Sequence, residues 1–108
     1  MYQIKFDKPR FDQKIFTSFR LGEKHHMALS VNQVVSLRNS YGLEVGQAKV
    51  KDKTILKYSQ IPLPLFELNH DPGCRDYEAM SRELMRVYPD WRGCHQQRFT
   101  VLTLEVEG

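Results

Sequence analysis

The sequence predicts an α+β fold: a small, partly closed mixed β-barrel of five to six strands with two helices, in the order β-α-β-β-β-α-β. Three observations predict it. Alternating apolar residues mark several short strands, only two stretches have helical spacing, and the segments follow one another without repeats or linkers. Because 108 residues suffice for one core but not for two, we expect a single domain spanning residues 1–108.

The first quarter of the chain predicts a strand and then a helix. Residues 2–6 (YQIKF) alternate as in a strand with one buried face. In 11–19 apolar residues recur at intervals of four, which is typical of one stripe of a helix. Gly22 stands where a glycine commonly ends a helix. A strand beginning after it would place Lys24 and His26 on one face.

The remaining elements follow from alternation, turn residues and helical spacing. The closing segment 98–107 (RFTVLTLEVE) has apolar residues on both faces, so we expect it in the interior of the sheet. The others are strands at 33–38, 43–51 and 53–58 with a turn at 39–42 and a bend at Asp52, an extended connector at 61–65 (IPLPL), and a helix at 77–87 that ends before Pro89.

Composition indicates a mildly basic protein of the cytoplasm. The net charge is +3 and the pI near 9.0, which is compatible with binding to nucleic acid. No apolar run has the ~20 residues of a membrane span, and the N-terminus lacks the apolar stretch of a secretory signal. We therefore expect no membrane association. Cys74 and Cys94 are too few for a disulfide framework, and we expect free thiols.

Several local sequences, taken together with this order of elements, resemble the ASCH domains, a branch of the PUA-like superfamily. The likeness covers nearly the whole chain. It rests on a G-x-K turn at Gly22-Glu23-Lys24, strands matched by 31–35 (VNQVV) and 48–57, a helix over 77–89 that ends in Tyr-Pro, and a closing strand at 99–105.

The resemblance implies a PUA-like barrel with a ligand cleft beside Lys24 and a function on RNA or modified nucleosides. Some members are amidohydrolases of acetylated cytidine, with a catalytic lysine, threonine and glutamate, and others have been proposed to be ribonucleases. Lys24 matches the lysine. Met27 stands at the threonine position, the arginine that usually follows is absent, and Asp71 lies near the place of the glutamate. These departures argue against amidohydrolase chemistry.

The candidate catalytic residues are Lys24, His26 and Asp71. A lysine desolvated in a cleft can act as nucleophile or base, and a histidine can transfer protons near neutral pH. A carboxylate such as that of Asp71 can serve as general acid or base. The alternative interpretation is that Lys24 and His26 belong to a solvated chain segment, and that Asp71 caps a helix that starts at Pro72.

A second group of candidates combines basic and aromatic side chains, which together hold single-stranded RNA by charge and by stacking. Tyr41 lies in the turn NSYG, where we expect it to be exposed. The predicted RNA-binding residues are Arg20, Lys24, Arg38, Tyr41 and Lys57.

A metal site is not expected, and neither is a cofactor. Possible ligands flank the helix at 77–87, but their spacing fits no common zinc motif, and adjacent cysteine and histidine would struggle to ligate one ion. These residues are His70, Asp71, Cys74, Cys94 and His95.

We therefore predict an RNA- or nucleoside-binding PUA-like domain, whose protein partners the sequence does not indicate. Whether it is an enzyme stays open: hydrolytic activity, as a ribonuclease or a modified-nucleoside amidohydrolase, and a binding module without chemistry are both compatible with the residues. The alternative from another class is a non-catalytic protein-interaction adaptor that retains the fold with a vestigial cleft.

Overall fold

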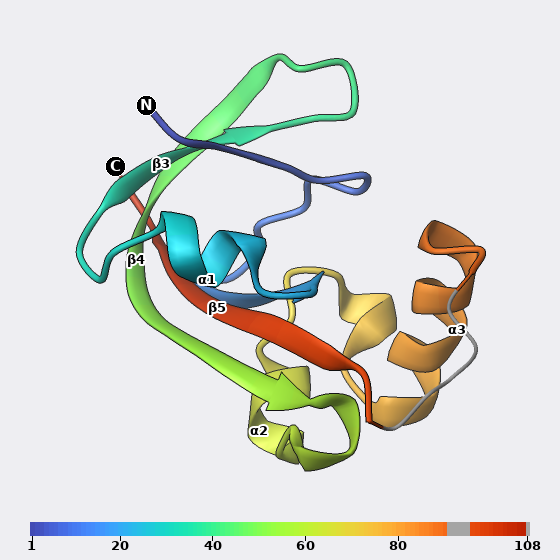
Figure 1. Ribbon diagram of the computed structural model, residues 1–108. Helices are drawn as coiled ribbons and strands as arrows, with labels where there is room; N and C mark the ends of the chain where they lie inside the picture. The colour runs from blue at the N-terminus through green and yellow to red at the C-terminus, as the bar shows by residue number, and fades with distance from the viewer. Residues whose placement is uncertain (91–95, 108) are drawn as a thin grey trace.

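The computed structural model describes residues 1–90 and 96–107, which form a five-stranded mixed sheet with short helices around it (Figure 1). The strand order in the sheet is β1-β3-β4-β5-β2; β1 pairs with β3 in parallel, and every other neighbouring pair is antiparallel. The strands are β1 (Gln3–Lys5), β2 (Ile15–Leu21), β3 (Val34–Arg38), β4 (Glu44–Lys57) and β5 (Arg98–Val106).

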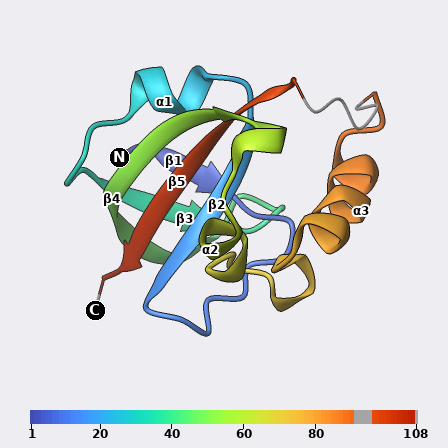
Figure 2. The same ribbon diagram turned by 90° about the horizontal axis from the view of Figure 1, so that it is seen from below.

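Three α-helices and two 3₁₀ turns complete the described part of the chain. They are α1 (Lys24–Ala28), α2 (Leu63–Glu67) and α3 (Tyr77–Val87), with 3₁₀ turns at Tyr58–Gln60 and Pro72–Cys74. Figure 2 shows α1 on one side of the sheet and α2 and α3 on another. None of the helices in the described ranges is long and apolar enough to cross a membrane.

The sheet does not close into the predicted barrel. Within the described residues, β1 and β2 are its two edges and do not pair with each other. Strand β4 is long and bent, and its earlier part pairs with β3 while its later part pairs with β5 (Figure 1). The bend predicted at Asp52 coincides with a β-bulge, because the register with β5 shifts between Val50 and Asp52 while the strand continues. The mixed α+β class is confirmed, and the partly closed barrel is not.

The predicted helix at 11–19 is wrong, since Ile15–Leu21 is strand β2. This strand pairs residue by residue with β5, with Phe16 opposite Leu104 and Phe19 opposite Val101. Phe16 and Phe19 are both buried, but they pack into different cores on opposite faces. The four-residue spacing therefore arises because both faces of this strand are buried, and it does not indicate a helix. Pairing with the distant strand β5 decides the local structure here.

Two further local predictions are corrected. The segment after Gly22 is helix α1, so Lys24 and His26 do not lie on a strand. Gly22 has φ 84°, a left-handed conformation that suits glycine at the turn from β2 into this helix. In the expected connector IPLPL, helix α2 begins at Leu63, and Pro64 is tolerated because the first helical turn needs no amide donors there.

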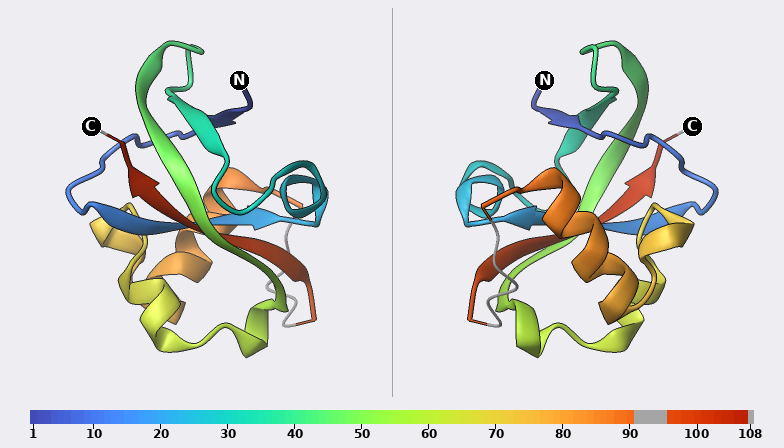
Figure 3. Two further views of the ribbon diagram at one scale, coloured as in Figure 1. Left: turned by 90° about the vertical axis from the view of Figure 1, so that its left-hand side faces the viewer. Right: turned by 90° about the vertical axis from the view of Figure 1, so that its right-hand side faces the viewer.

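The prediction that the last strand is interior is confirmed, because β5 lies between β4 and β2. Its two faces contribute to two apolar clusters. Leu102 and Leu104 pack with residues of β1, β2, β3 and β4, whereas Phe99 and Val101 pack against α2 and α3. In the right-hand view of Figure 3, α3 stands in front of the sheet. The helices thus cover the second cluster, and the curved sheet itself encloses much of the first.

Shortening a β5 side chain that packs in the first apolar cluster should destabilise the protein strongly. Leu102 is 0% exposed, so Leu102→Ala leaves a cavity and should lower the free energy of unfolding by about 2–5 kcal/mol. Leu43 is 65% exposed, and Leu43→Ala should change it by less than about 0.5 kcal/mol. Urea denaturation of both variants measures the contrast. Equal losses would contradict the assignment of β5 to the core.

Candidate functional site

A cavity of about 100 Å³ lies between β2, the segment around the end of β1, the 3₁₀ turn at Pro72–Cys74 and α3. One wall is apolar and includes Phe19, Met80 and Leu84. The remaining surface carries ionisable groups. Among the described residues that line it are three cations, Lys5, Lys8 and Arg20, and three carboxylates, Asp7, Asp71 and Glu83. The cavity therefore combines an apolar surface with fixed charges of both signs.

Arg20 is held in place by two contacts. In strand β2, Ser18 and Arg20 are two residues apart and face the same way. The Arg20 Nε donates a hydrogen bond to Ser18 Oγ at 2.9 Å, and its Cζ lies 4.6 Å from the centre of the Phe6 ring. Cation–π contact and the hydrogen bond fix the plane of the guanidinium. Burial lowers the pKa of Arg20 to about 10, partly opposed by Tyr88 and Tyr2, so the group stays charged at neutral pH.

No carboxylate pairs with Arg20 among the described residues. Its Nη atoms have no hydrogen-bond acceptor in that part of the chain either. Arg20 is partly buried, and a desolvated cation without a counter-ion is costly and is normally paired. The two free Nη groups form the fork that matches carboxylate or phosphate oxygens. This arrangement is suited to an anionic ligand.

Arg38 provides a comparison within the same sheet. It follows Ser36 on β3 in the same Ser-x-Arg spacing, and its Nε donates to Ser36 Oγ at 2.7 Å. Here the Nη1 atom also donates to the Gly42 carbonyl at 3.1 Å, and Glu44 accepts from Ser36 Oγ at 2.6 Å. The Arg38 fork is thus used within the β3–β4 hairpin. In the same Ser-x-Arg motif, an Nη group of Arg38 has a hydrogen-bond acceptor, whereas the Nη groups of Arg20 have none among the described residues.

His70 forms the neutral side of the cavity. Its ring packs edge-on against Phe6 at 4.8 Å between centroids. Burial, with a smaller contribution from the charge of Arg20, lowers the pKa of His70 to about 4, although Asp71 and the Thr17 carbonyl partly oppose the shift. Its Nδ1 is buried, and no acceptor or donor meets it at hydrogen-bonding geometry within the described residues. At neutral pH His70 is uncharged.

Ion pairs join the walls of the cavity. The Lys8 Nζ lies 3.4 Å from Glu83 on α3 and 3.8 Å from Asp71. Arg86 of α3 pairs with both Glu83 and Asp7. Hydrogen bonding from Arg86 holds the pKa of Glu83 below its usual value. These contacts tie the segment after β1 to α3 across the cavity.

Asp71 is both a cap and a part of the cavity wall. Its Oδ1 accepts from the Gly73 amide at 2.9 Å, as the alternative interpretation predicted. Partial burial raises its pKa, but the Gly73 amide and the charge of Lys8 outweigh that effect, so the pKa is lowered overall. The neighbouring Cys74 thiol is buried, and burial raises its pKa to about 12, which excludes a thiolate at neutral pH.

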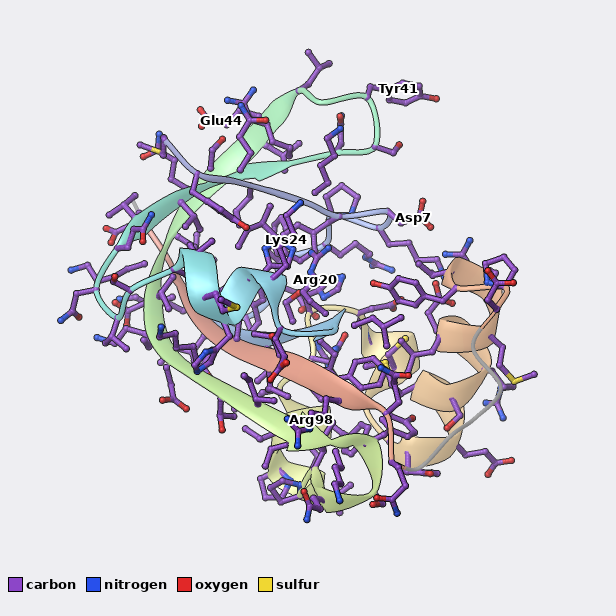
Figure 4. The ribbon with its side chains drawn as sticks, in the orientation of Figure 1. Asp7, Arg20, Lys24, Tyr41, Glu44 and Arg98 are labelled. Carbon is purple, nitrogen blue, oxygen red and sulfur yellow. The ribbon has the colours of Figure 1, made fainter. Side chains whose placement is uncertain are left out.

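The other two predicted catalytic residues lie on α1 and do not line the cavity. Consecutive helical residues are 100° apart, so Lys24 and His26 point roughly 200° apart and not the same way. Lys24 is exposed at the first position of α1 (Figure 4). Lys53 donates to the carbonyls of His26 and Leu29 at 2.8 and 2.7 Å, which fixes the end of α1 against β4. The catalytic roles stay predictions.

His25, which sequence reasoning did not select, is the α1 histidine that turns inward. Its Nδ1 hydrogen-bonds the Tyr2 hydroxyl at 2.6 Å. Burial lowers the pKa of His25, and the charges of Arg20 and Lys24 lower it further, so both cations lie near this ring. The end of β2 and the start of α1 therefore gather a guanidinium, an ammonium and an imidazole.

The five predicted RNA-binding residues do not form one surface. Arg20 lies in the cavity and Arg38 in the hairpin. Tyr41 is 89% exposed at the tip of the β3–β4 hairpin (Figure 4). Lys57 is the last residue of β4, at the other end of that strand. Lys57 borders a second, open hollow with Arg98 and Glu23. Their contacts with RNA stay predictions.

For the metal-site candidates, only part of the group is described. Cys94 and His95 lie outside the described residues. Within 1–90 and 96–107, no three histidine, cysteine or acidic side chains are grouped so that they could hold a metal ion.

Sequence reasoning selected Arg20 but missed Ser18, Lys8, His70 and Glu83 as parts of its surroundings. The available signal was the alternation Phe16, Ser18, Arg20, which places a serine and an arginine on the face of a buried aromatic. Assigning this segment to a helix concealed it.

The fold can be compared with known proteins. No family model matches the sequence, and no curated protein matches it significantly. Solved structures do match, and they show that the chain has an ASCH-like fold.

One similar structure is an ASCH domain from Lactobacillus crispatus JV V101, with a TM-score of 0.60 and 13% sequence identity over 86% of this chain. Another is protein EF3133 from Enterococcus faecalis V583, described as DUF984, with a TM-score of 0.60 and 11% identity over 92% of this chain. The match covers 64% and 62% of those chains, so this chain spans just under two thirds of their length.

Burial of His70 should make stability depend on pH. The folded protein keeps His70 neutral down to a pKa of about 4, whereas the unfolded chain takes up the proton near 6.5. The unfolded state binds more protons in between, so this contribution is complete above pH 6.5 and is lost as pH falls toward 4. Urea denaturation at pH 7.5 and pH 5 measures it. His70→Gln should show a smaller loss over that interval, and an equal loss would contradict the neutral, buried state.

Proposed function

We propose that this protein is an RNA- or nucleoside-binding domain and that Arg20 receives an anionic group of the ligand. The observation that carries the proposal is the Arg20 guanidinium, which is fixed by Ser18 and Phe6 while its Nη groups lack an acceptor among the described residues. Buried charge without a partner is destabilising, so a ligand that supplies the missing anion accounts for it. The ASCH-like fold and the basic net charge support a nucleic acid or one of its components.

Binding is favoured over catalysis by the placement of the candidate residues. Asp71 lines the cavity, whereas Lys24 and His26 lie on α1, outside its lining. Lys24 remains near enough to influence His25, as Arg20 does, and therefore can add to the positive potential at the end of β2. Met27 is 82% exposed and has no group for acid–base chemistry.

Replacing Arg20 should separate binding from stability. Arg20→Gln should weaken binding of single-stranded RNA or nucleotides about tenfold or more, because charge-assisted hydrogen bonds are lost. Without ligand, its unfolding temperature should be equal or higher, because a desolvated charge is removed. Fluorescence anisotropy at low salt and thermal denaturation measure the two effects.

Two matched variants serve as controls for Arg20→Gln. Lys51 is exposed on β4, so Lys51→Gln removes one positive charge at a distance and should leave affinity nearly unchanged. Arg38→Gln should lower the unfolding temperature because its guanidinium bonds within the hairpin. If RNA and nucleotides do not bind the wild type even at low salt, the proposal fails and the adaptor hypothesis is favoured. Loss of stability in Arg20→Gln would indicate a structural role.

Hydrolysis is tested separately. Wild type and Lys24→Ala should be equally inert toward single-stranded RNA and acetylated cytidine, because Lys24, His26 and Asp71 do not surround one cavity. Product formation is followed by chromatography. Turnover by the wild type that Lys24→Ala abolishes would overturn this and show an enzyme.

A further inference from the structure

We infer that the Arg20 cavity accepts a terminal phosphate monoester, the end of an RNA strand or a nucleotide, and not an internal phosphodiester of a continuous strand. The inference rests on the proposed function and specifies the group that Arg20 binds. It follows from three properties of the described cavity: one open guanidinium, balanced charge in the lining, and walls joined by ion pairs.

The cavity offers one strong anion-binding group. The other two cations in its lining are Lys5, which is exposed, and Lys8, which is engaged by Glu83 and Asp71. A groove that follows a nucleic-acid backbone needs successive free cations, one near each phosphate. Here the open fork of Arg20 is accompanied by one other unpaired cation among the described lining residues, the exposed Lys5. The lining therefore lacks the row of free cations that a backbone groove needs, and it matches a single anionic group.

The carboxylates in the lining oppose a continuous polyanion. Asp7, Asp71 and Glu83 equal the lining cations in number, so the described lining has no net charge when His70 is neutral. A strand running through the cavity would bring its next phosphates past these carboxylates, which costs free energy by like-charge repulsion. A group that enters alone and stops at Arg20 avoids that repulsion, since no carboxylate within residues 1–90 and 96–107 pairs with Arg20.

The ion pairs beside the cavity also limit the passage of a continuous nucleic-acid strand. Arg86 bonds Asp7 from α3, and Lys8 approaches Glu83, so the segment after β1 is tied to α3 beside the cavity. In Figure 4, Asp7 lies on this segment toward α3, and Arg20 lies between α1 and α3. Because the Lys8–Glu83 pair joins two residues that line the cavity, a continuous strand has less room to pass than a chain end has to enter.

A terminal phosphate also suits Arg20 better than an internal one. It has three non-bridging oxygens and carries about −1.5 to −2 charges near neutral pH, whereas an internal diester carries one. Bidentate hydrogen bonding from the Nη groups uses two of these oxygens, and the larger charge compensates the desolvated guanidinium. The apolar wall with Phe19, Met80 and Leu84 is available to the adjoining part of the ligand.

The test compares short single-stranded RNAs of one sequence with a 5′-phosphate, with a 3′-phosphate, or with hydroxyls at both ends. A nucleoside and its monophosphate form a second set, which distinguishes a strand end from a free nucleotide. Fluorescence anisotropy and calorimetry at fixed low salt give the affinities. At least one phosphorylated ligand should bind about tenfold more tightly than its hydroxyl counterpart.

Variants assign that preference to the cavity. Arg20→Gln should abolish it, and Arg20→Lys should retain only part of it, because an ammonium cannot form the bidentate fork. Lys51→Gln should keep the full preference. If phosphorylated and hydroxyl-ended ligands bind the wild type equally and Arg20→Gln weakens both, the inference is wrong while the proposed function stands. If no ligand of either set binds, the proposed function itself is refuted, and the inference with it.

Discussion

Strand β5 is the constraint on which the rest of this structure depends. It pairs with β4 on one side and β2 on the other, and each of its faces is buried in a different apolar cluster. Because alternate residues of β5 serve different clusters, a shift of register by one residue would exchange them. The pairing with β5 in turn fixes β2, and with it the direction in which Ser18 and Arg20 point. The cavity is therefore positioned by the interior of the sheet.

This dependence explains how a destabilising group persists in a small domain. Arg20 loses hydration without gaining a counter-ion among the described residues, and the buried pairing of β2 offsets the cost. The ion pairs of Lys8 and Arg86 then hold α3 against the opposite wall, although exposed pairs of this kind contribute little to stability individually. Their larger effect is on the shape and charge of the cavity. Departures from the usual pairing rules are expected at functional sites.

Prediction from sequence succeeded where local pattern and tertiary role agreed. The helix at 77–87 and the strands around 33–38 and 98–107 agree with α3, β3 and β5, and the ASCH-like fold is confirmed by solved structures. It failed at 15–21, where apolar residues on both faces of a strand imitated a helical stripe. It failed again after Gly22, where a five-residue helix is too short to show a period. Both errors bear directly on the candidate site.

The sequence by itself determined the class of fold, the interior position of the last strand and the presence of a basic segment around Arg20 and Lys24. Only the tertiary structure decided which of these cations is desolvated, which has a partner and what surrounds it. The reason is physical: alternation and composition are local properties, whereas desolvation and pairing depend on residues distant in the chain. Arg20 and Arg38 share the same Ser-x-Arg spacing. Their surroundings alone make the difference: Arg38 forms hydrogen bonds within the β3–β4 hairpin, whereas Arg20 keeps its Nη groups available to a ligand.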